Sequence, residues 1–334
     1  MNWLVTGGCG FIGSALVRAL AAEPGARVRV LDDLSSGSRS RLATAAAFRE
    51  TPAASAGPLG EAAGAEPVEL IVGDICDPAT ARIAARGADV VVHLAANTGV
   101  AQSVESPVAD CVTNVLGTLY LLEAARAQGV ARFVFASSGA PVGEVEPPIH
   151  EELAPHPVSP YGASKLAGEG YCSAYSRSFG LETVALRFGN VYGPGSDHKG
   201  SVVARFIRRA LRGEPLEVYG DGRQTRDFVF VADLVRAIRA AAAAPGVGGE
   251  IFQIATQRET TVLELVEALV PALEAAGVRG IEIAHAAPRV GDVLRNYSDT
   301  TKAREGLGWR AETPLARGLA LTVSWFLKNQ AALG

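Results

Sequence analysis

Short apolar segments alternate with longer amphipathic segments through the first half of the chain. The short segments lack the polar alternation of a half-exposed strand, which is typical of strands buried on both faces of a parallel sheet. The pattern predicts strands at residues 3–6, 27–31, 68–72, 89–94, 132–136 and 183–187. Between them it predicts helices at residues 14–22, 107–128 and 160–179. We therefore expect an α/β fold built on a doubly wound parallel sheet.

The pattern becomes less regular after residue 187. Thr261 and Glu264 form a capping box, which predicts the start of a helix. We expect a smaller, discontinuous C-terminal lobe over the carboxyl edge of the sheet, where open α/β sheets bind ligands. Its predicted elements are a helix at 201–211 and short strands at 216–218, 228–231 and 251–254. The expected domains are 1–189 with 224–255 for the sheet, and 190–223 with 256–334 for the lobe.

Residues 43–67 stand apart from both patterns. They are rich in Ala, Gly and Pro and show little periodicity. This composition favours a long surface loop or partly disordered insert over a broken helix.

The charge balance and the cysteines exclude some classes of protein. The 334 residues carry 31 Lys and Arg against 35 Asp and Glu, a net charge of −4 that argues against a nucleic-acid partner. No apolar run reaches the ~18 residues of a membrane helix. The cysteines lie far apart, without the spacing of a zinc site, at Cys9, Cys76, Cys111 and Cys172. We expect a cytoplasmic protein with no membrane contact and no metal.

A glycine-rich turn follows the first predicted strand and opens the first predicted helix. Residues 6–13 read Thr-Gly-Gly-Cys-Gly-Phe-Ile-Gly. Gly7 allows the tight turn, Gly10 lets the backbone approach a pyrophosphate, and Gly13 permits close packing of helix on strand. The helix N-terminus adds free N–H groups for the anion. In this strand–turn–helix context the motif is typical of a Rossmann dinucleotide-binding domain.

Acidic residues end the next two predicted strands. A carboxylate at Asp32 can accept both ribose hydroxyls and would repel a 2′-phosphate, which favours NAD over NADP. Asp33 is a second candidate, or caps the following turn. Asp74 can accept from the adenine amino group, or can cap the next helix.

A tyrosine and a lysine lie four residues apart at the start of the helix predicted at 160–179. Ser159 suits the N-cap position, and the spacing places Tyr161 and Lys165 on one helix face. An ammonium near a phenol stabilises the phenolate and lowers its pKa toward the range of a general base. Ser137 and Ser138 end a strand at the same edge of the sheet and can hydrogen-bond a reacting hydroxyl.

With these motifs the chain resembles the extended short-chain dehydrogenases/reductases, in particular the NAD-dependent nucleotide-sugar epimerase/dehydratase family and its UDP-glucose 4-epimerase branch. The resemblance covers the chain end to end apart from residues 43–67. It implies a homodimer formed by the helices predicted at 107–128 and 160–179. It implies that the catalytic residues are Ser138, Tyr161 and Lys165. The implied NAD-binding residues are Gly7, Gly10, Phe11, Ile12, Gly13, Asp32, Asp33, Asp74, Ile75, Leu94, Ala95, Ala96, Asn114, Ser137, Tyr161 and Lys165.

The same resemblance implies a UDP-sugar substrate. Asn190, Arg226 and Arg289 match the residues that contact its diphosphate, and guanidinium forks suit a pyrophosphate. Asn296 matches a gate of the sugar pocket and is intermediate between the bulky and small residues found there. The implied substrate-binding residues are Ser138, Asn190, Val203, Tyr219, Arg226, Arg289, Asp292 and Asn296.

Two departures from the family pattern bear on the substrate. Val142 stands where this branch usually has a tyrosine near the sugar. The loop Asp197-His198-Lys199-Gly200 carries cationic groups that can meet a sugar C6 carboxylate, which keeps UDP-glucuronate among the candidates; a solvated loop is the alternative.

The residues after Ser138 discriminate between reactions. Related dehydratases and decarboxylases place acidic residues there for C5 and C6 chemistry, whereas this chain has Gly139 and Ala140. This favours an NAD-dependent 4-epimerase of a UDP-sugar that acts through a transient 4-keto intermediate. The alternatives are a dehydratase, decarboxylase or reductase on the same scaffold, or a non-catalytic NAD-binding protein. The intact Ser138, Tyr161 and Lys165 argue against the last of these.

Overall fold

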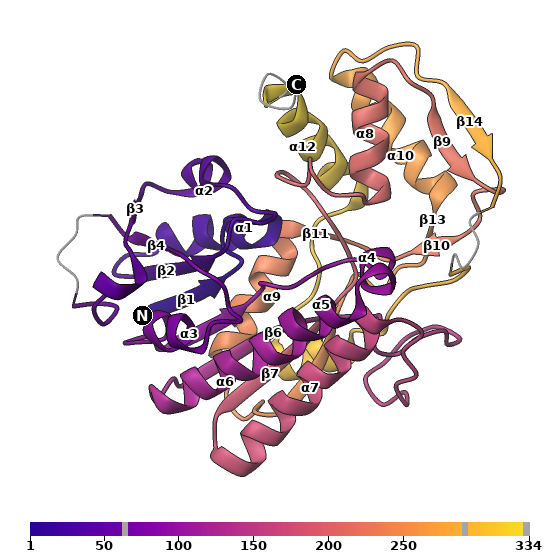
Figure 1. Ribbon diagram of the computed structural model, residues 1–334. Helices are drawn as coiled ribbons and strands as arrows, with labels where there is room; N and C mark the ends of the chain where they lie inside the picture. Colours follow the sequence, from indigo (N-terminus) through magenta and orange to yellow (C-terminus); the bar gives the residue numbers. More distant parts are fainter. Residues whose placement is uncertain (62–65, 289–292, 330–334) are drawn as a thin grey trace.

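The computed structural model describes residues 1–61, 66–288 and 293–329. An eight-stranded sheet forms its centre, in the order β12-β7-β6-β5-β1-β2-β4-β3, and every neighbouring pair is parallel (Figure 1). β2, β4 and β3 lie on one side of β1, and β5 lies on the other. The strand order thus changes direction at β1, and a crevice is expected there at the carboxyl ends of β1 and β5. The strands are β1 (Asn2–Thr6), β2 (Arg27–Asp32), β3 (Phe48–Glu50), β4 (Val68–Val72), β5 (Val90–His93), β6 (Arg132–Ser138), β7 (Glu182–Phe188) and β12 (Glu250–Ile254).

Helices cover both faces of this sheet, as the sequence predicts. One apolar cluster joins the sheet to the helices α1 (Phe11–Ala21), α2 (Arg39–Ala45), α9 (Val231–Ala243) and α11 (Thr301–Leu307). A second cluster joins the opposite face to α3 (Pro78–Ala84), α6 (Gly117–Ala127) and α7 (Pro160–Phe179). The prediction of a doubly wound α/β sheet is therefore confirmed.

A smaller lobe with its own apolar core lies beside the carboxyl edge of the sheet (Figure 1). Its parallel strand pair is β9 (Leu216–Tyr219) and β14 (Ile283–Ala286), packed with the helices α8 (Val202–Leu211), α10 (Val262–Ala275) and α12 (Leu315–Lys328). The capping box of α10 is formed as predicted. Helix α11 falls in the chain segment that we assign to the lobe, yet it packs on the sheet.

Short strand pairs connect the two parts. β8 (Asn190–Tyr192) lies parallel to β11 (Phe228–Phe230), and β10 (Thr225–Arg226) lies antiparallel to β13 (Thr260–Thr261). Where these four strands cross between sheet and lobe, the chain therefore passes in hydrogen-bonded pairs.

The surface loop predicted for residues 43–67 is wrong in the part that the structure describes. That part contains the end of α2, the edge strand β3 and a 3₁₀ turn (Ala53–Ser55). β3 pairs with the exposed edge of β4, and Arg49 pairs with Glu69 at 3.1 Å. A three-residue edge strand is too short to carry a periodic signal, so its partner strand determines it.

The helix predicted at 107–128 is continuous but not uniform. It consists of α5 (Pro107–Cys111), a π-helical turn (Val112–Leu116) and α6, and it is preceded by α4 (Val100–Glu105). Among the described helices it alone is long and apolar enough to cross a membrane, but α6 is packed on the sheet as a core helix.

A buried ion pair fastens the outer strands. Arg29 on β2 is fully buried, and its guanidinium contacts the Glu69 carboxylate on β4 at 2.7 Å. Its remaining N–H groups donate to the backbone carbonyls of Gly57, Ile83, Ala84 and Arg86. Burial raises the pKa of Glu69, but the two arginines beside it outweigh burial and hold it below its usual value.

We expect Glu69→Gln to lower the free energy of unfolding by about 3–5 kcal/mol, because it leaves a buried guanidinium without its counter-charge. The matched control Glu50→Gln removes an exposed pair with Arg39 and should cost much less, because solvent screens that pair. Urea unfolding at neutral pH measures both values. The difference should shrink as the pH falls through the acidic range, because Glu69 is then protonated in both states. Equal losses in the two variants would contradict this role.

Candidate active site

The carboxyl ends of the central strands surround a cavity of about 300 Å³, here called the first cavity. It extends from the glycine-rich turn and the end of β2 to the end of β6 and the start of α7. All but one of the predicted NAD-binding residues line it. These are Gly7, Gly10, Phe11, Ile12, Gly13, Asp32, Asp33, Asp74, Ile75, Leu94, Ala95, Ala96, Ser137, Tyr161 and Lys165.

The glycine-rich turn fits a pyrophosphate because it leaves no room for side chains. A Cβ atom at Gly13 would lie 2.1 Å from the Gly7 carbonyl oxygen, and one at Gly7 would lie 2.8 Å from the Ala95 nitrogen. Gly10 is the N-cap of α1 and supplies no side-chain acceptor. The first N–H groups of the helix therefore remain available to an anion.

Three carboxylates line the end of the first cavity at β2 and β4. Asp32 is 6% exposed, and its two oxygens accept the N–H groups of Cys9 at 2.8 Å and Leu34 at 2.9 Å. Burial raises its pKa, and these hydrogen bonds partly offset the effect. Each oxygen keeps a further lone pair for a ribose hydroxyl.

The other two aspartates have local partners. Asp33 accepts from the Ser35 N–H and hydroxyl, so it caps the turn. Asp74 accepts the Cys76 N–H at 2.8 Å, and the N-cap of α3 is Asp77. The helix-capping alternative for Asp74 is therefore wrong.

Asn114 lies behind the first cavity rather than on its wall. Its side chain is 1% exposed and exchanges two hydrogen bonds with the Asn97 backbone, at 2.9 and 3.0 Å. It also donates to Asp110 and Ser164. Asn97 itself lines the cavity, so Asn114 positions the loop after β5, and its own contact with the cofactor stays a prediction.

The Ser–Tyr–Lys group comes together at the other end of the first cavity. Ser159 caps α7 as predicted, which sets Tyr161 and Lys165 on the first turns of the helix. Ser138 ends β6, and both it and Tyr161 line the cavity. Burial raises the pKa of Tyr161, and a hydrogen bond with Ser138 lowers it in part.

The expected effect of Lys165 on Tyr161 is not what the structure shows. The Lys165 ammonium donates to the Ala136 carbonyl at 2.9 Å and lies 4.9 Å from the centre of the Phe135 ring. Its own pKa is lowered to about 8 by burial. A carbonyl at the end of β6 therefore orients the ammonium.

A buried cluster beneath the site is invisible to motif analysis. Glu169 accepts a hydrogen bond from the Ser137 hydroxyl at 2.6 Å. It also accepts the Nε and Nη2 N–H groups of Arg187, each at 2.8 Å. The only available signal is spacing, since Glu169 lies four residues after Lys165 on α7.

A second cavity, of about 320 Å³, separates the sheet from the lobe and shares Gly189 with the first. Asn190, Val203, Tyr219 and Arg226 line it as expected. Arg226 donates to the carbonyls of Thr225 and Val293. Sequence analysis missed two further lining residues, Arg205 and Gln224. The Arg205 guanidinium lies 4.8 Å from the centre of the Tyr219 ring.

Other predicted substrate residues have different positions. Asn296 does not line the second cavity; its backbone N–H donates to Thr225 at 3.1 Å. Val142, which replaces a tyrosine of the branch, is fully buried. Arg289 and Asp292 lie outside the described residues.

The cationic loop faces the first cavity. His198 and Lys199 both line that cavity, whereas Gly200 lines the second. His198 is exposed and Lys199 half-buried, and both lie on the side of the predicted cofactor site rather than on the side where a sugar carboxylate was expected.

The fold and the first cavity define a dinucleotide-binding protein of the Rossmann type with a Ser–Tyr–Lys site. Residues 3–255 match the family described as the NAD dependent epimerase/dehydratase family, and the chain belongs to it. NAD is accordingly its cofactor, and the glycine-rich turn and Asp32 have the geometry to hold it.

Relatives of two activities are similar over nearly the whole chain. A UDP-glucose 4-epimerase of Mycolicibacterium smegmatis is 40% identical over 331 residues, 98% of each chain. A dTDP-glucose 4,6-dehydratase of Streptomyces niveus is 35% identical and covers 99% of this chain and 94% of its own. The solved UDP-glucose 4-epimerase of Thermotoga maritima with UDP-glucose has a TM-score of 0.85 and 38% identity, over 99% and 100% of the two chains.

Gly13→Ala should weaken NAD binding by about 10- to 100-fold, because the added methyl group clashes with backbone at the pyrophosphate turn. Gly170→Ala is the matched control, since a Cβ there meets nothing within 4 Å. The amount of NAD retained per chain after gel filtration measures the effect. Full retention of NAD by Gly13→Ala would show that the turn does not form the cofactor site.

Proposed function

We propose that this protein is an NAD-dependent 4-epimerase of a UDP-sugar. The candidate pairs are UDP-glucose and UDP-galactose, their N-acetylated counterparts, and UDP-glucuronate and UDP-galacturonate. One observation carries the proposal: no carboxylate lines either cavity near Tyr161. Among the described lining residues the only carboxylates are Asp32, Asp33 and Asp74. They lie at β2 and β4, and β2 is three strands, or about 14 Å, from β6.

This charge distribution supports epimerisation over dehydration. Removal of water across C5 and C6 needs an acid and a base beside those carbons, and Gly139 and Ala140 offer neither. Inversion at C4 needs a single proton acceptor that returns the proton. Ser138 and Tyr161 lie together at the cavity wall and form such a relay.

The chain's residues have separate roles in the proposed reaction. Ser138 orients the sugar 4-hydroxyl, and Tyr161 accepts its proton and later returns it to the 4-keto sugar. NAD, when bound, would supply the hydride acceptor for C4 and the hydride donor for the return to its other face. Lys165, fixed on the Ala136 carbonyl, keeps a buried positive charge beside the reacting groups.

The lining of the second cavity supports a nucleoside diphosphate as the part of the substrate that the protein holds. Asn190 and Arg226 supply an amide and a guanidinium for the diphosphate, and the Tyr219 ring offers a face for the base. A grip on the diphosphate alone leaves the sugar free to rotate, which presents both faces of C4 to the same relay.

A purified sample incubated without added NAD should convert one of UDP-glucose, UDP-N-acetylglucosamine and UDP-glucuronate into its 4-epimer, resolved by NMR. Tyr161→Phe should lower the rate by at least about 100-fold, because it removes the proton acceptor. Tyr171→Phe, an exposed tyrosine on the same helix, is the matched control. A 4-keto-6-deoxy or pentose product would instead favour a dehydratase or decarboxylase, and NAD binding without turnover a non-catalytic protein.

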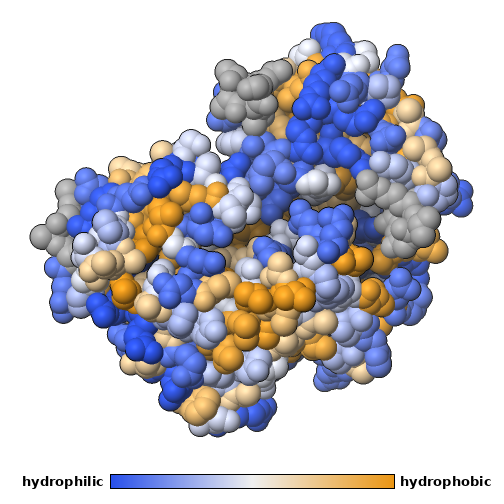
Figure 2. Space-filling model, in the orientation of Figure 1, coloured by the Kyte–Doolittle hydropathy of each residue, from blue (hydrophilic) through white to orange (hydrophobic). Residues whose placement is uncertain are grey.

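We also propose a homodimer formed by the helices at 107–127 and α7. Val104, Val108, Val112 and Leu116 follow one another at intervals of four residues, and all are exposed. Figure 2 shows apolar surface where α5, α6 and α7 lie in Figure 1. A stripe of this spacing suits helix packing between two copies.

The double variant Val108→Asp with Val112→Asp should be monomeric, because it places charges in the centre of the stripe. Leu321→Asp on α12, equally an exposed apolar position, should leave the association unchanged. Sedimentation velocity at micromolar concentration distinguishes the two states. A monomeric wild-type protein would refute the proposed dimer.

A further inference from the structure

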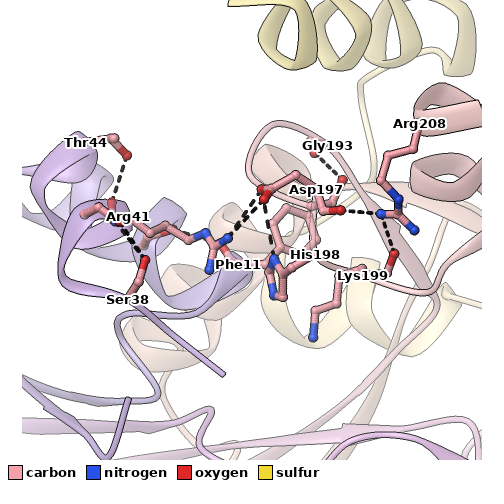
Figure 3. Close-up of polar contacts among 12 residues, drawn as sticks. Phe11, Ser38, Arg41, Thr44, Gly193, Asp197, His198, Lys199 and Arg208 are labelled. Carbon is pink, nitrogen blue, oxygen red and sulfur yellow. Dashed lines mark hydrogen bonds and ion pairs between the residues drawn. The ribbon is translucent and has the colours of Figure 1, made fainter. Parts of the chain in front are cut away.

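The loop of residues 193–200 covers the N-terminus of α1. It leaves the sheet after β8 and leads into α8 of the lobe. Gly195 lies against the first residue of α1, since a Cβ there would be 3.6 Å from the Phe11 ring. Figure 3 shows Phe11 beside His198. The loop therefore lies next to the turn where the helix N-terminus offers its free N–H groups.

Contacts from both parts of the molecule hold this loop. Arg41 of α2 contacts the Asp197 carboxylate at 3.3 Å, and the two side chains are only 14% and 11% exposed. From the other side, Arg208 of α8 donates to the carbonyls of Asp197 and Lys199 (Figure 3). Partial burial makes the Arg41–Asp197 pair stronger than an ordinary surface pair.

The ammonium of Lys199 faces the first cavity without a partner. In the part of the chain that the structure describes, its Nζ atom has no hydrogen bond and no ion pair, while Asp197 is engaged by Arg41 and lies 4.0 Å from His198. Burial and the charge of Arg41 both lower the pKa of Lys199. The loop thus holds Lys199 where burial and the nearby Arg41 disfavour its charged form.

The charges around the first cavity indicate which ligand would favour the cation at Lys199. The cofactor is a dinucleotide, and its pyrophosphate carries two negative charges. The lining cations are His198 when protonated, Lys165 and Lys199, and Lys165 is held at the end of β6. At the glycine-rich turn the protein otherwise offers only backbone N–H groups.

We propose that Lys199 binds the pyrophosphate of the bound NAD, and that the Arg41–Asp197 ion pair keeps its loop closed over the cofactor. Lys199 thus supplies the counter-charge that the glycine-rich turn lacks. The inference rests on the cofactor of the family and not on the proposed epimerase activity.

Two ligands separate this role from a structural one. Nucleotide-free protein is titrated with ADP, which carries the pyrophosphate, and with adenosine, which does not. Lys199→Met should weaken ADP binding by about 10- to 100-fold and leave adenosine binding unchanged. Lys199→Arg should restore most of the ADP affinity, because it keeps the charge.

The opposite results are equally clear. Unchanged ADP affinity, or equal losses for ADP and adenosine, would overturn the proposal. A loss confined to UDP would assign Lys199 to the substrate instead. Neither outcome depends on turnover, so a failure here is distinct from a failure of the proposed reaction.

The ion pair is tested by the rate at which the intact protein releases NAD. Asp197→Asn should speed release by about 10-fold, because the loop is freed from α2. Asp221→Asn is the matched control, since it removes an exposed aspartate whose contact is with Arg223. Release at the wild-type rate in Asp197→Asn would show that the loop does not retain the cofactor.

Discussion

The carboxylate of Glu169 joins β6 and α7, the two elements that carry the reacting groups, to β7. It is 2% exposed and binds Ser137 of β6 and Arg187 of β7, two residues that stand opposite each other in the parallel register. Its own helix, α7, presents Lys165 about one turn and Tyr161 about two turns earlier. A buried carboxylate is costly unless every oxygen is satisfied, and here a bidentate arginine and a hydroxyl satisfy it. The buried Glu169 and Arg187 therefore help to fix the relative position of Ser138 and Tyr161.

Features that a few consecutive residues determine could be predicted from the sequence. The strands before and after the glycine-rich turn, the start of α7 at Ser159 and the capping box at Thr261 all lie where local chemistry puts them. Parallel strands with apolar faces also fix the edge at which their ends meet. That is why most of the residues predicted for the cofactor line one cavity.

Features that depend on distant partners could not be predicted. β3 exists because β4 offers an open edge, and Asn114 is buried because the Asn97 loop folds over it. The Lys165 ammonium was expected to act on Tyr161, but the Ala136 carbonyl, 29 residues earlier, takes it. The loop that carries Lys199 is likewise held by Arg41, 156 residues before Asp197 in the chain. In each case the deciding contact is long-range and leaves no trace in sequence spacing.

The paired crossings between sheet and lobe limit how the molecule can deform. Two short hydrogen-bonded strand pairs, β8 with β11 and β10 with β13, lie across the junction between sheet and lobe. A single flexible linker would let the lobe rotate relative to the sheet, whereas hydrogen-bonded strand pairs resist both bending and twisting. The two halves should therefore move little relative to each other, and access to the buried chemistry becomes a matter of short loops.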